Sequence, residues 1–476
     1  MTIKNIIIAG GGTAGWSTAA ILSSLRNINI TVLDPSDIPT IGVGESTLPH
    51  IHQAHQVMGF DIFRKKDWLD SVDGTLKLTI EFADFYKKDS LWVHPFFDSY
   101  GIDREWLTNR LINGVGQDTN NIKQCDFMFA NTSAGRRRKR GFIDNTSWFS
   151  NAGCTKEAAF HMNAILYAQS IKNLTLKKSN VKTLDEAITA VNYASDGSIA
   201  SVQLRSGVTV AADMFVDCTG SKAVLLNAVE EPWISANDQL FVDGAWLVQL
   251  PYIDKSVQLR NTTYCHALSS GWVFNIPLQS RIGTGYIFSS SHQNDSAAAE
   301  EFANHLSSMY GYDKDKLSFK RLKFPTGYRK QQWVKNVIGV GMSSFFCEPL
   351  ESTAIAMGNS TALCLREALN NQHVDINILR TRLNDSQYEL ATSVLDFVEM
   401  HYTLTEREDS AFWKDYKNKP LTAAQEHWIE LYTKAPNNKR FLLSNIKSVF
   451  GNFGMFCNVS YAMMFYGYNM KPAAAV

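Results

Sequence analysis

Residues 4–16, Lys-Asn-Ile-Ile-Ile-Ala-Gly-Gly-Gly-Thr-Ala-Gly-Trp, lead from an apolar segment directly into a glycine-rich turn. Gly10, Gly12 and Gly15 have the G-x-G-x-x-G spacing. In that pattern the first glycine permits a tight turn, the second lets the backbone approach a pyrophosphate, and the third lets a helix pack closely on the strand. Because the pattern alone occurs in many proteins, the segments around it decide its meaning.

Those segments complete a βαβ unit. We predict a helix over residues 17–26, whose N-terminal N–H groups and positive dipole end point at the phosphate. A second apolar strand, 29–33, ends at Asp34, about 20 residues after the glycines, where a carboxylate binds a ribose hydroxyl. A glycine turn without a ligand is the alternative. The order of strand, glycines, helix, strand and acid favours a dinucleotide site.

Composition limits the partners of the chain. Its 476 residues carry 46 basic and 46 acidic side chains, and this zero net charge argues against nucleic acid or an anionic membrane as partner. We find no apolar run of roughly 18 residues that would span a membrane. Seven scattered cysteines without a C-x-x-C pair favour reduced thiols over disulfides or a metal site. Together with the absence of a signal-peptide pattern, this predicts a cytoplasmic protein.

The remaining pattern predicts a β-rich region followed by helices. We expect a helix over 158–170, a hairpin over 187–204, and antiparallel strands over 239–290. Two further strands are predicted, at 208–216 and 333–342, and helices from 375 onward. The strand at 208–216 runs into Asp217 and Gly220. A second flavin contact needs such a pair, a buried carboxylate and a bare backbone beside the cofactor. This order predicts an α/β, Rossmann-type FAD-binding fold like that of flavoprotein monooxygenases, with an inserted antiparallel sheet and a helical C-terminal cap.

Four ordered segments resemble signatures of the flavin-dependent tryptophan halogenase family. They are Gly-Gly-Gly-Thr-Ala-Gly-Trp (10–16), Ile-Gly-Val-Gly-Glu-Ser-Thr (41–47), Glu-Pro-Leu-Glu-Ser-Thr (348–353), and Asp-Phe-x-x-x-His-Tyr with Arg-Glu-Asp-Ser-x-Phe-Trp (396–413). The resemblance runs from residue 4 to about residue 415. It implies one FAD-binding module over 1–415, with an active-site loop at 348–354, and a helical cap over 416–476 that is integral to the same unit.

The resemblance implies two catalytic residues. Lys77, in Gly-Thr-Leu-Lys, matches the family lysine that hydrogen-bonds hypohalous acid or becomes a haloamine. Strand alternation alone places Lys77 on a polar face, so a solvated lysine is the alternative. Glu351 matches the glutamate that faces the lysine, stabilises the charged arene and accepts its proton.

Cofactor and halide contacts are implied in the same way. Halide binds the backbone N–H groups of Thr353 and Ala354. Since the family usually has Gly where Ala354 stands, the preference among bromide, chloride and iodide stays open. The implied FAD contacts are Gly10, Gly11, Gly12, Thr13, Ala14, Gly15, Asp34, Val43, Gly44, Glu45, Ser46, Asp217, Gly220, Met342, Ser352 and Ile355.

The substrate side departs from the family pattern. The motif Trp-x-Trp-x-Ile-Pro, which separates substrate from flavin, appears here with Phe274 in place of the second Trp, between Trp272 and Pro277. His94 and Phe96 have the spacing of the residues that line the family's indole pocket. The C-terminal segment that clamps the amino-acid moiety of free tryptophan is not recognisable. This favours another indole or a phenol as substrate.

The resemblance therefore implies halogenation of an electron-rich arene that depends on FADH2 and O2, with hypohalous acid delivered to Lys77. Because the chain has one dinucleotide fingerprint, a separate flavin reductase is expected to supply FADH2. Two alternatives remain: a flavin-dependent aromatic hydroxylase, and a flavin-binding protein without activity. The oligomeric state is open, and a dimer is possible.

Overall fold

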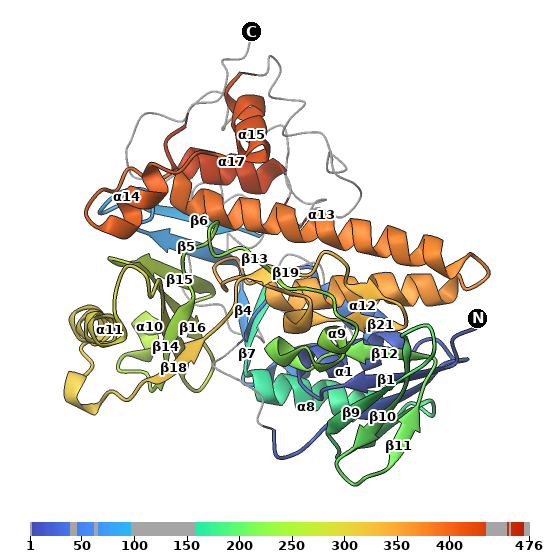
Figure 1. The fold of residues 1–476 in the computed structure, drawn as a ribbon. Helices are drawn as coiled ribbons and strands as arrows, with labels where there is room; N and C mark the ends of the chain where they lie inside the picture. Colours follow the sequence, from blue (N-terminus) through green and yellow to red (C-terminus); the bar gives the residue numbers. More distant parts are fainter. Residues whose placement is uncertain are drawn as a thin grey trace. The chain divides into compact units, whose positions relative to one another are not determined.

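The structure is a computed structural model that describes residues 2–38, 45–60, 65–96, 158–434, 455–456 and 458–470 (Figure 1). The chain divides into two interleaved units. Unit 1 comprises residues 1–72, 162–238 and 324–391, and unit 2 comprises residues 73–161, 239–323 and 392–476. The division into a module over 1–415 and a cap over 416–476 stays a prediction.

Unit 1 is built on a six-stranded, mainly parallel sheet with the strand order β20-β21-β12-β1-β2-β8. The strands are β1 (Asn5–Ala9), β2 (Asn29–Leu33), β8 (Val181–Leu184), β12 (Met214–Asp217), β20 (Trp333–Val334) and β21 (Val337–Gly339). Strand β1 lies at the centre and pairs in parallel with both β2 and β12. The predicted βαβ unit is confirmed, although its helix α1 begins and ends earlier than expected, at Thr13–Leu22.

Both faces of this sheet are covered. On one face, Ile7 and Ala9 of β1 pack into a core with the meander β9 (Ile188–Tyr193), β10 (Ile199–Leu204) and β11 (Thr209–Ala211). Ile6 and Ile8 alternate to the other face and are equally buried. Helix α1 contacts α8 (Ala164–Thr175) and α12 (Ala354–Asn370). Residues 15–22 of α1 are all buried, as an apolar helix between layers requires.

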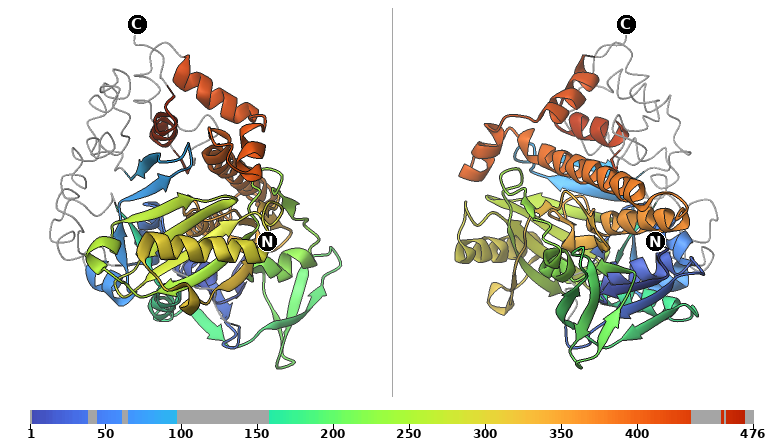
Figure 2. Two further views of the ribbon diagram at one scale, coloured as in Figure 1. Left: turned by 90° about the vertical axis from the view of Figure 1, so that its left-hand side faces the viewer. Right: turned by 45° about the vertical axis from the view of Figure 1, so that its right-hand side comes forward.

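Unit 2 contains the predicted antiparallel sheet, enlarged to seven strands with the order β18-β14-β17-β16-β15-β5-β6. The strands are β5 (Thr79–Ala83), β6 (Leu91–Pro95), β14 (Gly244–Leu250), β15 (Thr262–Ala267), β16 (Gly271–Pro277), β17 (Ile282–Phe288) and β18 (Lys320–Lys323). Only the β15–β5 pair among them is parallel. Helix α11 (Asp295–Tyr310) runs along one face of this sheet (Figure 2) and packs its Phe302 there.

The predicted helical C-terminal region is confirmed in the described residues. Its helices are α13 (Ile376–Thr403), α14 (Ala411–Lys417), α15 (Ala423–Thr433) and α17 (Asn458–Gly467). A capping box at Thr422 and Gln425 starts α15. The 28-residue helix α13 contributes its first part to unit 1 and its last part to unit 2.

Three local predictions are wrong in part. Residues 159–162 form strand β7 (Ala159–Met162), and α8 starts only at Ala164, after Asn163 has capped it. The strand predicted over 208–216 is divided between β11 and β12, which belong to different sheets. The strand predicted over 333–342 is a short hairpin of β20 and β21, followed by the 3-10 helix η4 (Gly341–Ser343).

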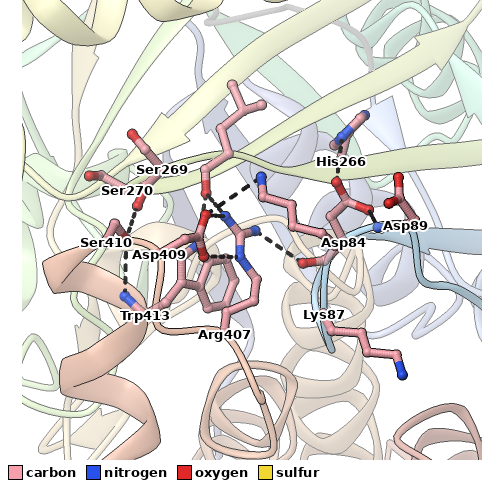
Figure 3. Close-up of polar contacts among 12 residues, drawn as sticks. Asp84, Lys87, Asp89, His266, Ser269, Ser270, Arg407, Asp409, Ser410 and Trp413 are labelled. Atoms are coloured by element: carbon pink, nitrogen blue, oxygen red, sulfur yellow. Dashed lines mark hydrogen bonds and ion pairs between the residues drawn. The ribbon is translucent and has the colours of Figure 1, made fainter.

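The Arg-Glu-Asp-Ser-x-Phe-Trp signature forms a structural clamp within unit 2 (Figure 3). The Arg407 side chain is 1% exposed and lies over the Trp413 ring, 4.4 Å from its centroid. Its guanidinium donates to the carbonyl oxygens of Asp84 at 3.0 Å and Leu268 at 3.1 Å. It also makes a bidentate pair with Asp409, with both distances 2.8 Å, which lowers the pKa of that carboxyl to about 2. One guanidinium thus ties the start of α14 to two turns of the sheet.

We expect Arg407→Lys to lower the free energy of unfolding by about 2–3 kcal/mol, because an ammonium cannot serve both buried carbonyls and the carboxylate. Chemical denaturation measures the change. Lys88→Ala is the matched control, since Lys88 pairs with the same Asp409 at 3.6 Å but is 57% exposed. Such a surface pair is worth at most about 1 kcal/mol. Equal losses in the two variants would contradict the clamp.

Candidate functional site

The glycine turn in unit 1 has the geometry that its spacing predicts. Gly10 has φ +107, and a Cβ built on it would lie 2.3 Å from the carbonyl oxygen of Cys218. A Cβ on Gly15 would lie 1.8 Å from the carbonyl oxygen of Gly10, so only glycine lets α1 pack this close to the turn. Both positions therefore require glycine for the fold itself, before any ligand is considered.

Gly12 differs, because it faces open space. A Cβ built on it meets no described atom within 4 Å. Gly12 is also the N-cap of α1, and no side chain caps this helix end. The N–H groups of the first turn, from Thr13 and Ala14 onward, point toward that space with the positive end of the helix dipole. The residues present therefore fit the pyrophosphate of FAD.

Asp34 lies against the glycine turn. A Cβ on Gly11 would lie 1.6 Å from its Oδ1, which gives Gly11 a packing role that the spacing does not indicate. Its Oδ2 accepts hydrogen bonds from Trp16 Nε1 at 3.2 Å and from Lys172 Nζ at 2.6 Å. Lys172, on α8, was missed by the sequence analysis because it is distant in the chain. Contact of Asp34 with a ribose stays a prediction.

Asp217 organises the loop that follows β12. Its Oδ1 accepts from the N–H and hydroxyl of Thr219, and its Oδ2 accepts from the N–H groups of Leu225 and Leu226 at 2.7 and 2.9 Å. Gly220 has φ +67, and a Cβ there would meet no described atom within 4 Å. Asp217 thus shapes the loop, and Gly220 is the open position in it. Their contact with a flavin stays a prediction.

Two more segments of unit 1 join this region. A Cβ on Gly341 would lie 3.0 Å from the Cβ of Ala14, so η4 with Met342 adjoins the start of α1. Ser352 donates a hydrogen bond to Ser46 at 3.0 Å, which connects the loop at 348–354 to strand β3 (Glu45–Ser46). Val43, Gly44 and the side chain of Glu45 lie outside the described residues.

The loop at 348–354 ends at the N-terminus of α12. A turn closes with the N–H of Ser352 donating to Pro349 O at 3.0 Å. Glu351 within it is buried, and Ser352 has the left-handed φ of 60. Thr353 is the N-cap of α12, and no side chain caps this end either. Ala354, the first helical residue, is exposed. Ile355, the next residue of α12, is buried at 9% exposure. Free N–H groups at a helix start are suited to an anion.

In unit 2, Lys77 ends the short strand β4 (Thr75–Lys77), and its relative exposure is 0%. The alternative of a solvated strand lysine is therefore wrong. Its Nζ lies 5.0 Å from the centroid of the Phe96 ring, within the range of a cation–π contact. A buried lysine next to an aromatic ring can bind an electrophilic species through its Nζ, close to where an aromatic substrate would pack on the ring.

His161, on β7, pairs with Thr75 on β4, next to Lys77. Its Nδ1 lies 3.2 Å from Thr75 Oγ1 and its Nε2 lies 2.8 Å from Thr263 Oγ1. Burial and the charge of Lys77 lower the pKa of His161 well below its usual range, so the ring is neutral. Because a helix was predicted over 158–170, sequence spacing does not indicate His161 as a neighbour of Lys77.

The predicted pocket residues lie in unit 2, in two groups. His94 lies near the end of β6 and Phe96 directly follows the strand, and their ring centroids are 6.1 Å apart. His94 Nε2 is 3.0 Å from Ser460 Oγ on α17. Trp272 and Phe274 are buried on β16 with centroids 6.1 Å apart. Pro277 ends the same strand and accepts a hydrogen bond from Thr75 at 2.7 Å. Lys77 thus contacts Phe96, and Pro277 is joined through Thr75 to the strand that carries Lys77. Trp272 and Phe274, two residues apart, share one face of β16.

Two properties of the described residues concern metal sites and membrane spans. They contain no group of three or more His, Cys, Asp or Glu side chains placed to hold a metal ion. None of their helices combines the length and apolar character needed to cross a membrane.

Comparison with known proteins agrees with this geometry. The family model described as tryptophan halogenase matches residues 5–476. The chain is 28% identical to the tryptophan 6-halogenase ThaL of Streptomyces albogriseolus, over 99% of this chain and 90% of the relative. It is 28% identical to the tryptophan 7-halogenase RebH of Lentzea aerocolonigenes, over 99% and 91%. The solved structure of a flavin-dependent halogenase from Xanthomonas campestris superposes with a TM-score of 0.84 at 26% identity, covering 100% of this chain and 91% of that one. The chain is therefore a flavin-dependent enzyme that halogenates aromatic substrates, and it belongs to the tryptophan halogenase family.

Proposed function

We propose that this FADH2- and O2-dependent halogenase acts on an indole or phenol other than free tryptophan, with Lys77 delivering the halogen and Glu351 assisting the substitution. The observation that carries the proposal is the complete burial of Lys77 beside the Phe96 ring. Lysine side chains are rarely fully buried, because burial removes the hydration of the charged group. Complete burial therefore indicates a specific role for this lysine. The absence of a recognisable clamp for an amino-acid moiety supports the substrate class.

The cofactor is FAD, and the cradle of Gly12, the α1 N-terminus and Gly220 fits it. Reduced FAD, when bound, supplies with O2 the oxidising power that turns halide into hypohalous acid. The chain's own part on the halide side is the start of α12, where the N–H groups of Thr353 and Ala354 bind the anion.

Lys77 acts on the hypohalous acid. Its ammonium donates a hydrogen bond to the oxygen of HOX and polarises the O–X bond, or its amine exchanges a hydrogen for X and releases water. Either route presents an electrophilic halogen to an arene carbon. Glu351 stabilises the positive charge that forms on the ring and takes the displaced proton.

The family works with a separate flavin reductase and an aromatic substrate, and we propose a small arene as the substrate of this chain. We also propose the cytoplasm as its compartment. Four of the seven cysteines, Cys218, Cys265, Cys347 and Cys364, are described, and none of these four is in a disulfide. Reduced thiols are the usual state in that compartment. Light scattering tests whether the chain forms a dimer.

One assay tests the function. The enzyme is incubated with FAD, NADH, a flavin reductase, indole and bromide, and the products are examined by mass spectrometry. We expect the isotope doublet of a monobrominated product, and free tryptophan should be the poorer substrate in a parallel incubation. A product that gains one oxygen indicates an aromatic hydroxylase. The lack of any product across a panel of indoles and phenols indicates a flavin-binding protein without activity.

Ala354 supports a prediction about halide choice. A methyl group at the anion site pushes the ion outward and weakens short N–H contacts. Chloride is small and strongly hydrated, so it loses more than bromide does. We expect wild type to brominate faster than it chlorinates in an equimolar competition, and Ala354→Gly to narrow the gap. Ala356→Gly, the same change two residues along α12, is the control. A wild-type preference for chloride would refute the prediction.

A further inference from the structure

We propose that His161 is a positioning residue for Lys77, and that it acts through a directed chain of hydrogen bonds, Thr263–His161–Thr75–Pro277, that holds strand β4 in place. This inference rests on the proposed function of Lys77 and extends it to a residue that no sequence signature indicates. All members of the chain belong to unit 2.

The strand register places His161 beside the lysine. In the antiparallel β4–β7 pair, Thr75 is opposite His161 and Lys77 is opposite Ala159. Because side chains alternate along a strand, Thr75, Lys77, His161 and Ala159 share one face. His161 is then the diagonal neighbour of Lys77, and the residue directly opposite the lysine is the small Ala159.

The contacts determine which group donates and which accepts at each step of the hydrogen-bond chain. The hydroxyl of Thr75 donates to the carbonyl oxygen of Pro277 at 2.7 Å, so it receives the bond from His161 Nδ1 at 3.2 Å. Nδ1 therefore carries the proton of the neutral ring, and Nε2 accepts from the Thr263 hydroxyl at 2.8 Å. With this tautomer, Thr75 and both ring nitrogens each have a matching donor or acceptor in these three hydrogen bonds.

The hydrogen-bond chain joins strands that are far apart in the sequence. Thr75 connects β4 to the end of β16, and His161 connects β7 to β15. Two side-chain amides add support to the same strand, because Gln279 donates to Gly74 O at 2.8 Å and Asn261 donates to Leu76 O at 3.1 Å. Those two bonds hold the β4 backbone. His161 differs from them because it lies on the face of the Lys77 side chain.

The neutrality of His161 is part of the arrangement. Its pKa is lowered by burial first and by Lys77 second, so the ring does not place a second positive charge beside the lysine. A protonated ring would carry a second N–H that Thr263 could meet only by reversing its hydroxyl, and it would repel the ammonium. The hydrogen-bond chain thus positions Lys77 and adds no positive charge beside it.

The test compares two products of the same enzyme under the indole and bromide assay: brominated indole, and hypobromous acid caught by a scavenger in solution. The variants are His161→Phe, His161→Asn, which keeps a donor near the Nδ1 position, and Thr263→Val. Thr79→Val is the matched control, since Thr79 is buried on β5 and donates a hydrogen bond to Thr262 at 2.8 Å, outside the hydrogen-bond chain of His161. Melting temperature is recorded for each.

We expect His161→Phe to lower brominated indole about 10-fold or more, the scale on which a small misplacement of a reacting group acts. Trapped hypobromous acid should rise in the same variant. His161→Asn should recover part of the yield, Thr263→Val should fall between, and Thr79→Val should match wild type. This split supports positioning, because a purely structural defect would lower both products together.

Two results overturn the inference. One is an unchanged bromination yield in His161→Phe. The other is a fall of both products in step with melting temperature in all variants, Thr79→Val included. Lys77→Ala, run alongside, separates this failure from failure of the proposed function. If Lys77→Ala still brominates, the role of the lysine is wrong. If it does not, and His161→Phe does, only the positioning role is lost.

Discussion

Lys77→Ala should abolish halogenation of indole and leave FAD binding intact. The lysine acts after hypohalous acid has formed, and the FAD cradle is built from residues of unit 1 while Lys77 belongs to unit 2. Product is measured by mass spectrometry and FAD binding by quenching of flavin fluorescence.

The control for this variant is Lys87→Ala. Lys87 belongs to the same unit but is exposed, and its Nζ lies 5.4 Å from the Tyr86 ring, so the same deletion should leave turnover near wild type. Brominated indole formed by Lys77→Ala at a near wild-type rate would show that the buried lysine is structural. Loss of FAD binding in that variant would show that its effect is not confined to the later step.

Glu351→Gln should lower the rate about 10²-fold or more, which is the scale for loss of a placed charge or proton acceptor. Glutamine keeps the size of the side chain but cannot accept a proton as a carboxylate does, so the turn closed by the Ser352 N–H and Pro349 O should keep its shape. Steady-state product formation with indole and bromide measures the rate.

Glu348→Gln is the matched control, because Glu348 lies in the same loop and is equally buried at 0% exposure. We expect it to keep turnover within a few-fold of wild type. If the two variants lose activity equally, the loop needs buried carboxylates for its structure and Glu351 has no separate chemical role. If Glu351→Gln turns over normally, its assignment fails alone.

Local sequence was sufficient wherever the physical cause is local. The tight turn at Gly10, the close helix at Gly15 and the open position at Gly12 follow from backbone sterics over a few residues. The same holds for the period-two alternation over 239–290, which became β14 to β17, and for the helices after residue 375.

Partners distant in the chain explain what the sequence missed. The apolar residues over 158–170 were interpreted as helical, yet Phe160 and Met162 have the two-residue spacing of a strand. Strand β7 forms because Phe160 pairs with Leu76, more than eighty residues earlier. Asn163 then begins α8 by capping it. His161 was hidden by that error, since its neighbours are defined by strand pairing and not by spacing along the chain.

The sequence by itself therefore determined the dinucleotide-binding unit, the fold class and the candidate residues Lys77 and Glu351, because glycine turns, periodicity and signature segments are properties of contiguous residues. Only the tertiary structure decided that Lys77 is buried beside Phe96 and that a neutral His161 lies next to it. Strand alternation had placed that lysine on a polar face. Burial depends on which other strands cover the face, and that is decided by contacts between segments far apart in the chain.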